Sequence, residues 1–479
     1  MAGPKFCGKT TTCMLYQKSF VKLNTKQAIS MARMNPRAML AGDKPRLIDE
    51  WQKAPDIWNQ VKDDLDFEYQ FGKYILTGSS TPADKTEVHH SGAGRITPLY
   101  MRPMTLWESK ESKGTVSLTD LFDGGKDFPW DMNADFTLDD VAFLMCRGGW
   151  PISVLAPKDI ALEITKNYYN GLFVFEDSEN ERFRNKKPEV MRMILRSYAR
   201  NISTEAAVST IISDIRQSNE RTMDTKTYVD YMEALKDLYI IEDLNAWNPN
   251  IRSNTSIRST PTRHFVDTSI ACRSLGVSPD DLKNDLENFG LFFEDFAVRD
   301  LTVYASWLGG TVRHYRDNAG LECDAVVHLE DGRWGGIEIK LGGDDLVNDG
   351  AESLKTLQNK IIEKSDDVVW TFGFGYAQMN KVMQSVKSLN VSILNSDLLP
   401  VCSGMDACKS RFSFARADPA GSNNIGSRPF AYAPVLSLLK GSLKIIRKAK
   451  YENLTPEDRR YVDTMDKAIA KKRMERRYR

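Results

Sequence analysis

Three short segments near the start of the chain predict an α/β fold in which a parallel sheet carries a phosphate-binding loop. Residues 3–10 fit the pattern GxxxxGK[ST], which ends in Lys9 and Thr10. Residues 45–50 and 73–80 then have the pattern of short apolar strands that end in polar side chains. Because the carboxyl ends of buried parallel strands meet at one edge of a sheet, we expect the three segments to converge there.

The loop offers the groups that a nucleotide's phosphates require. Gly3 and Gly8 let the backbone curl so that its N–H groups point at phosphate oxygens, and the helix expected after them adds its positive dipole. Lys9 supplies a positive charge for the β- and γ-phosphates, and Thr10 a hydroxyl for Mg²⁺. The predicted cofactors are ATP and Mg²⁺; a chance match to so short a pattern is the alternative. The predicted ATP-binding residues are Gly3, Pro4, Lys5, Phe6, Cys7, Gly8, Lys9, Thr10 and Thr11.

The two later segments end in side chains suited to hydrolysis. We expect Asp49 to bind Mg²⁺ together with Thr10, and Glu50 to polarise the attacking water. A strand ending in solvated acids is the alternative. Ser79, after the next strand, is expected to contact the γ-phosphate. The gap between Lys9 and Asp49 leaves room for an inserted strand.

The chain begins two residues before Gly3, so the strand that normally precedes such a loop is expected to be missing. A parallel sheet without that central strand would leave buried backbone groups unpaired on its two neighbours. The sequence therefore predicts a P-loop sheet that lacks its first strand. A decayed, non-catalytic binding protein is one alternative that this expectation leaves open.

Composition excludes few classes of protein. The chain has 65 basic and 65 acidic side chains, so its net charge gives no indication of a nucleic-acid partner. Its seven cysteines form no CxxC pair, which argues against a disulfide framework or a zinc site and favours the reducing cytoplasm. No apolar run approaches the ~18 residues of a membrane span. We expect about three domains and no membrane association.

The middle of the chain is expected to be helical. Residues 190–198 carry apolar side chains at helical spacing, a second helix is expected from Thr225, and residues 238–241 look like a short strand. Two helices and a strand are typical of a winged helix, which either binds DNA or serves as a packing module. Asp230 and Glu233 lie close to Lys226 in the sequence, and their negative charge favours packing over phosphate contact.

The last predicted unit has the order of strands and charges found in PD-(D/E)xK nucleases. Asp324 lies in one predicted strand, and Glu338 and Lys340 lie in the next. In such a core the two acids bind Mg²⁺ and the lysine orients the nucleophilic water. Glu294, on the preceding helix, matches the position of an auxiliary acid in such a nuclease core. A nuclease-like scaffold that docks protein or nucleic acid is the alternative, and we favour it because no basic residues surround these positions in sequence.

Residues 47–55, 75–80 and 91–95 resemble a prokaryotic family of AAA-type P-loop ATPases whose C-terminal domain of unknown function has a restriction-endonuclease-like core. The likeness extends from Gly3 to about residue 400. It implies that residues 3–10 are Walker A, that Asp49 and Glu50 are Walker B, and that residues 77–79 are sensor 1. It also implies that Arg95 contacts the γ-phosphate in cis or in trans; a surface salt bridge is the alternative for this residue.

Together these observations predict four units. They are an AAA-type nucleotide-binding domain with a helical lid (1–150), a winged-helix-like segment (185–260), a restriction-endonuclease-like domain (262–400), and a linker with a basic helical tail (401–479). The predicted function is ATP binding with Mg²⁺-dependent hydrolysis. The alternatives are a DNA-directed nuclease that uses ATP as a switch and the decayed binding protein. DNA, a partner protein and an oligomer stay open as partners beside ATP.

Overall fold

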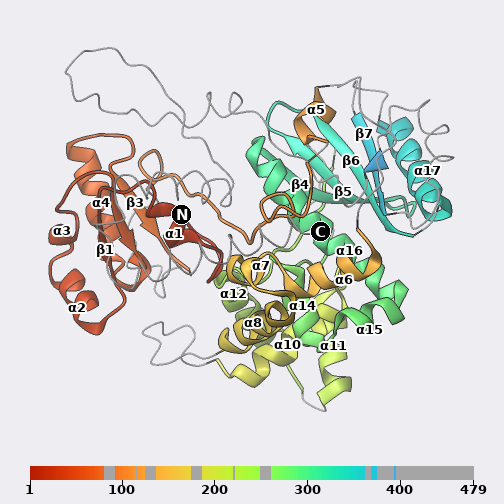
Figure 1. Ribbon diagram of the computed structural model, residues 1–479, viewed down its shortest axis with the longest axis horizontal. Helices are drawn as coiled ribbons and strands as arrows, with labels where there is room; N and C mark the ends of the chain where they lie inside the picture. Colours follow the sequence, from red (N-terminus) through yellow and green to blue (C-terminus); the bar gives the residue numbers. More distant parts are fainter. Residues whose placement is uncertain are drawn as a thin grey trace, which may run out of the picture.

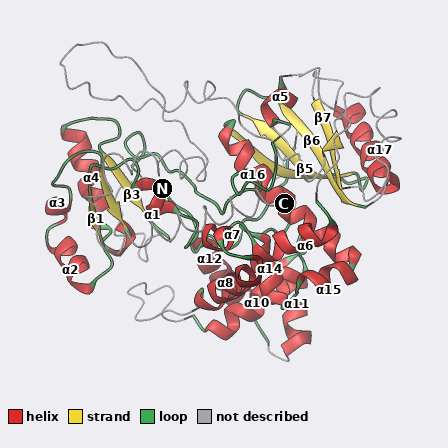
Figure 2. Cartoon of the chain, in the orientation of Figure 1, coloured by secondary structure: helices red, strands yellow, loops and turns green. Residues whose placement is uncertain are grey.

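The computed structural model describes residues 1–79, 92–114, 116–123, 136–173, 186–219, 222–248, 260–342, 344–361, 368–374 and 393–394. In Figure 1 an N-terminal α/β part lies on the left, a helical part below, and a second α/β part at the upper right. Figure 2 shows the strands in two groups, each flanked by helices, whereas the part below them is helical. The predicted tail at 401–479 lies outside the described residues.

The N-terminal part is built on a parallel sheet with the order β1-β2-β3, formed by Ser19–Lys22, Arg46–Asp49 and Tyr74–Thr77. Its helices are α1 (Lys9–Cys13), α2 (Lys26–Met34), α3 (Pro36–Met39) and α4 (Asp56–Phe67), with a 3₁₀ turn η1 at Trp51–Lys53. Ile48 of the central strand and Ile57 and Val61 of α4 share one apolar core. The predicted parallel α/β sheet, including its inserted strand β1, is confirmed.

Residues 1–2, which precede the loop, form backbone hydrogen bonds with neighbouring segments on both sides. Gly78 N donates to Met1 O over 3.1 Å, Ala2 N donates to Leu99 O over 2.8 Å, and Met101 N donates to Ala2 O over 2.8 Å. Residues 1–2 therefore lie between the end of β3 and residues 99–101, in parallel bridges rather than a regular strand. The unpaired backbone groups expected here are not found at these positions, because neighbouring segments supply the hydrogen bonds.

The middle part consists of helices. They are α6 (Leu138–Arg147), α7 (Pro151–Leu155), α8 (Lys158–Gly171), α10 (Pro188–Arg200), α11 (Val208–Asn219), α12 (Thr225–Asp237), α14 (Thr268–Leu275) and α15 (Pro279–Asn284). Capping boxes at Thr137 and Ser278 satisfy the first N–H groups of α6 and α15. The strand expected at 238–241 is reduced to isolated antiparallel bridges, which pair Ile241 with Phe265 and Leu244 with Thr262. The winged-helix assignment stays a prediction.

The second α/β part has a mixed sheet with the order β4-β5-β6-β7-β8, and helix α5 (Leu118–Phe122) contacts it through a hydrogen bond from Arg333 to Phe122 O. The strands are Gly310–Arg316, Glu322–Leu329, Trp334–Leu341, Val368–Phe374 and Ile393–Leu394; β4, β5 and β6 are antiparallel, whereas β6, β7 and β8 are parallel. Helix α16 (Leu286–Trp307) precedes β4, and α17 (Asp344–Ile361) joins β6 to β7. Ala325 and Val327 face the core that contains α16, whereas Val326 faces the core that contains α17, as the alternation of a strand requires.

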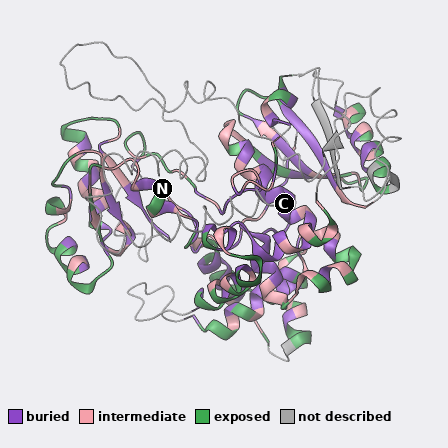
Figure 3. Cartoon of the chain, viewed as in Figure 1, coloured by how far each residue is buried: buried purple, intermediate pink, exposed green. Residues whose placement is uncertain are grey.

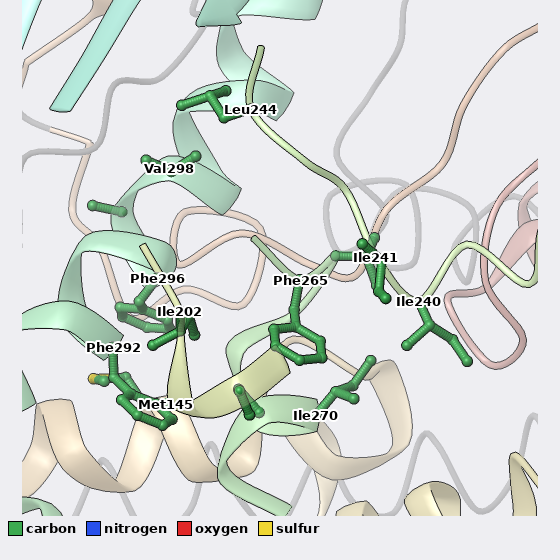
Figure 4. Close-up of a cluster of buried hydrophobic side chains, with 14 of the residues drawn as sticks. Met145, Ile202, Ile240, Ile241, Leu244, Phe265, Ile270, Phe292, Phe296 and Val298 are labelled. Atoms are coloured by element: carbon green, nitrogen blue, oxygen red, sulfur yellow. The ribbon is translucent and has the colours of Figure 1, made fainter. Parts of the chain in front are cut away.

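Helix α16 joins the middle part to the second sheet. Its side chains Phe292, Phe296 and Val298 lie in the same apolar cluster as Phe265 and Ile270 (Figure 4). Figure 3 shows that buried residues concentrate where the helices around α14 meet α16. The middle helices and the second sheet therefore share one core. Among the described helices, none is long and apolar enough to cross a membrane.

Candidate functional site

The loop at residues 3–10 has a backbone that curves around its own lysine. Gly3 and Gly8 have φ values of 145° and 100°, and Phe6 is left-handed at 65°. A Cβ atom at Gly3 would lie 2.0 Å from the Met101 carbonyl oxygen, so only glycine fits there. Lys9 Nζ donates to Gly3 O over 2.8 Å and to Pro4 O over 2.5 Å. The ammonium group thus lies inside the curve of the loop.

The carboxylate of Asp49 joins the loop to the sheet. Asp49 ends β2 with a side chain that is 3% exposed. Its Oδ1 atom accepts a hydrogen bond from Thr10 Oγ1 over 2.8 Å and another from Thr77 Oγ1 over 2.5 Å. The structure therefore brings the three predicted segments together at one carboxylate, because β2 and β3 are parallel neighbours that end at the same edge.

Glu50 follows in a left-handed conformation with φ 61°, which turns the chain from β2 into η1. Its carboxylate accepts from Ser79 Oγ, over 3.3 Å to Oε1 and 3.2 Å to Oε2. It also accepts from Gln52 Nε2 over 2.7 Å. Glu50 and Ser79, predicted separately, are therefore in contact. Gln52 was not predicted from the sequence, because nothing in the spacing of Asp49 and Glu50 identifies a hydrogen-bond partner two residues after Glu50.

Arg95 lies against the outside of the N-terminal part. Its Nε atom donates to Asp66 Oδ1 of α4 over 2.6 Å, and its side chain is 43% exposed. This is the kind of surface ion pair that the sequence analysis gave as the alternative. A role for Arg95 at the γ-phosphate stays a prediction.

The outer side of the loop packs against α7 and α8. Cys7 is fully buried, and burial raises the pKa of its thiol. The ring of Phe6 meets Tyr168 edge-on at 5.8 Å, and Tyr168 lies 4.1 Å from Trp150, between ring centroids. Lys5 and Thr11 are exposed. Of the predicted loop residues, Gly3, Pro4, Lys9 and Thr10 therefore contact groups of the site, whereas Phe6 and Cys7 pack toward the helical part.

The second predicted site lies across β5 and β6. Lys340 Nζ is 3.1 Å from Asp324 Oδ2 and 2.6 Å from Glu338 Oε2. Asp324 Oδ2 also accepts from Ile339 N over 2.7 Å. Burial and then the charge of Asp324 raise the pKa of Glu338 to about 8, and the same two causes raise the pKa of Glu294 on α16. All four predicted residues therefore belong to one electrostatic group.

Metal ligands are sparse in the part of the chain that the structure describes. There, no group of three or more His, Cys, Asp or Glu side chains is arranged to hold a metal ion. At the N-terminal site, Asp49 and the Thr10 hydroxyl are the oxygen donors placed together. These are the kinds of ligand that Mg²⁺ accepts when phosphate oxygens and water complete its shell.

Comparisons with known proteins match three regions of the chain. Residues 1–110 match a family model described as an AAA domain, and residues 138–281 and 289–386 match two domains of unknown function, DUF8612 and DUF4143. The N-terminal part is therefore a P-loop ATPase-like AAA domain, which indicates an ATPase-type nucleotide-binding protein. The C-terminal part is a DUF4143 domain.

Two curated relatives match most of the chain at low identity. The uncharacterized proteins Rv2008c of Mycobacterium tuberculosis and Mb2031c of Mycobacterium bovis are each 23% identical over 346 residues, which cover 71% of this chain and 69% of theirs. A crystal structure of protein VC1899 from Vibrio cholerae covers 78% of both chains at 8% identity. Its TM-score of 0.19 is too low to indicate a shared fold.

Proposed function

We propose that this protein binds ATP with Mg²⁺ at the loop 3–10 and hydrolyses it. The observation that carries the proposal is the Asp49 carboxylate, which accepts hydrogen bonds from both Thr10 and Thr77. An acid held beside the loop's threonine is the donor pair that nucleotide-bound Mg²⁺ requires. Mg²⁺, when bound, would neutralise charge on the phosphates.

Each residue has a role that follows from its position. Lys9 lies inside the loop, where its ammonium group is placed to bind phosphate oxygens. Glu50 is the acid next to the metal-binding Asp49, and it would take the proton of the attacking water as a general base. Ser79 donates its one hydroxyl proton to Glu50 and would turn that proton to the γ-phosphate when ATP is bound.

Two lysines of the same loop provide a matched test of binding. Lys9→Ala deletes a charge-assisted contact of ~1.5–3 kcal/mol, so Kd for Mg²⁺-ATP should rise roughly 10- to 150-fold. Lys5→Ala keeps the backbone N–H that the loop offers to phosphate and removes only an exposed side-chain charge, so it should change Kd little. Isothermal titration calorimetry measures both values. Equal affinities for the two variants and the parent would contradict the proposed site.

Hydrolysis is tested separately from binding. Glu50→Gln should bind Mg²⁺-ATP as tightly as the parent and release phosphate only at a small residual rate, because water activation is needed only in the transition state. A phosphate-release assay on the purified chain measures this. A Glu50→Gln variant that turns over at the parent's rate would remove Glu50 from the mechanism.

For the C-terminal part we propose a restriction-endonuclease-like scaffold that docks protein or nucleic acid without cleaving it. Support for the fold comes from the order helix, three antiparallel strands, helix and parallel strand, formed by α16, β4–β6, α17 and β7. Support for a scaffold comes from Lys340, which is paired with both Asp324 and Glu338. A nuclease that uses ATP as a switch is the alternative.

The five described cysteines are all buried and form no disulfide bond. They support a reducing compartment such as the cytoplasm.

A further inference from the structure

Gln52 lies in η1, two residues after Glu50, and is 8% exposed. Its Nε2 atom donates to Glu50 Oε2 over 2.7 Å. The left-handed backbone of Glu50 makes this contact possible, because it folds η1 back toward the end of β2. A non-glycine residue in that conformation is strained, so the surrounding contacts must hold it in place.

The other end of the Gln52 amide is enclosed by the end of β3. Within the described structure Oε1 is buried and has no hydrogen-bond partner. A Cβ atom at Gly78 would lie 2.7 Å from it, so the absence of a side chain at Gly78 makes room for the amide. Burying an unsatisfied acceptor costs free energy that an apolar side chain of similar size would avoid. The stabilising contact of this amide is therefore its donation to Glu50.

We propose that Gln52 is a positioning residue for Glu50. Its amide holds the carboxylate in one orientation, also when the Ser79 hydroxyl turns from Glu50 to the γ-phosphate, and leaves the carboxylate acceptor capacity for a proton of the attacking water. The inference rests on the proposed hydrolysis of ATP through Glu50. Gln52 acts through Glu50 and does not contact the nucleotide.

Two variants break the contact from opposite sides. Gln52→Leu removes the donor at similar volume, and Gly78→Ala pushes the amide away from its present position. Each should lower kcat for ATP hydrolysis about 10- to 100-fold, because a misplaced catalytic group loses rate steeply. Kd for Mg²⁺-ATP should stay within about twofold of the parent. Gln27→Leu, at an exposed glutamine of α2, is the matched control and should leave both values unchanged.

A double-mutant cycle separates positioning from a structural role. In a Glu50→Gln background the change Gln52→Leu should cause no further loss of rate, because the group that it positions is already disabled. The melting temperature of Gln52→Leu should not fall, since the unsatisfied acceptor is removed with the donor. Independent, multiplicative losses in the cycle, or an unchanged kcat in both Gln52→Leu and Gly78→Ala, would overturn the inference. A parent that hydrolyses no ATP would refute the proposed function, whereas a parent with the same rate as both Gln52→Leu and Gly78→Ala would refute only the positioning role.

Discussion

Replacing Arg299 by methionine should be among the most damaging single changes in this protein. Arg299 lies on α16 with Nη1 3.0 Å from Asp267 Oδ2 and Nη2 2.7 Å from Asp300 Oδ1, and the three side chains are at most 2% exposed. Asp267 also accepts from Gly149 N over 2.9 Å, and Asp300 from Leu106 N over 2.8 Å. The guanidinium group therefore neutralises two buried acids, and these acids bind the backbone at residues 106 and 149.

The magnitude follows from the charges left behind. Arg299→Met leaves two buried carboxylates without a cation, and breaking a buried pair in this way costs about 3–5 kcal/mol. That is a large fraction of the 5–15 kcal/mol that ordinarily stabilises a protein. Urea unfolding followed by tryptophan fluorescence measures the loss directly.

A matched control and a rescue make the test specific. Arg313→Met removes an exposed arginine from β4 and should change the free energy of unfolding by no more than about 0.5 kcal/mol. Combining Arg299→Met with Asp267→Asn and Asp300→Asn should recover part of the loss, because the amides are neutral yet still accept the backbone hydrogen bonds. A loss below about 1 kcal/mol for Arg299→Met alone would refute the reasoning, since the desolvation of the arginine would then cancel its attraction to the two acids.

Three further predictions concern the same region and the second site. Burial raises the pKa of Glu108 to about 7 from an ordinary value of 4.5. The free energy of unfolding should therefore fall as pH rises from about 4.5 to about 7, and Glu108→Gln should flatten this slope in urea titrations. Gly149→Ala would place a Cβ atom 2.1 Å from the Met104 carbonyl oxygen, so it should lower the melting temperature; an unchanged value would mean that the backbone yields freely. The full chain with Mg²⁺ or Mn²⁺ should leave supercoiled plasmid intact, because Lys340 is paired with both acids, whereas cleavage that Asp324→Ala abolishes would establish the nuclease alternative.

The sequence was sufficient to predict which residues meet at the loop, because strand direction alone decides it. Thr10 follows the loop, Asp49 ends one parallel strand and Ser79 follows the next, so all three reach the same edge of the sheet. Asp324 and Lys340 were grouped instead by the order and spacing of a PD-(D/E)xK core, and the antiparallel pairing of β5 with β6 brings their side chains together. These are local patterns whose geometry the fold class determines.

Other features could not be predicted from spacing. The contact of Gln52 with Glu50 depends on one left-handed backbone conformation, which residue types alone do not specify. The pairing of Arg299 with Asp267 joins α16 to the residue that caps α14, and sequence patterns treat such charges as exposed. Tertiary packing decides both.

The buried acids also bear on how the AAA domain is attached to the rest of the chain. Met101 pairs with the backbone directly in front of the loop, and Leu106 N donates to Asp300 of α16. Glu294 of the second site lies on the same helix. A free hinge between the loop and α16 would require breaking a buried, charge-assisted hydrogen bond, which is costly because the carboxylate would be left without its donor. The contacts of residues 101–106 therefore favour a rigid attachment of the loop to α16.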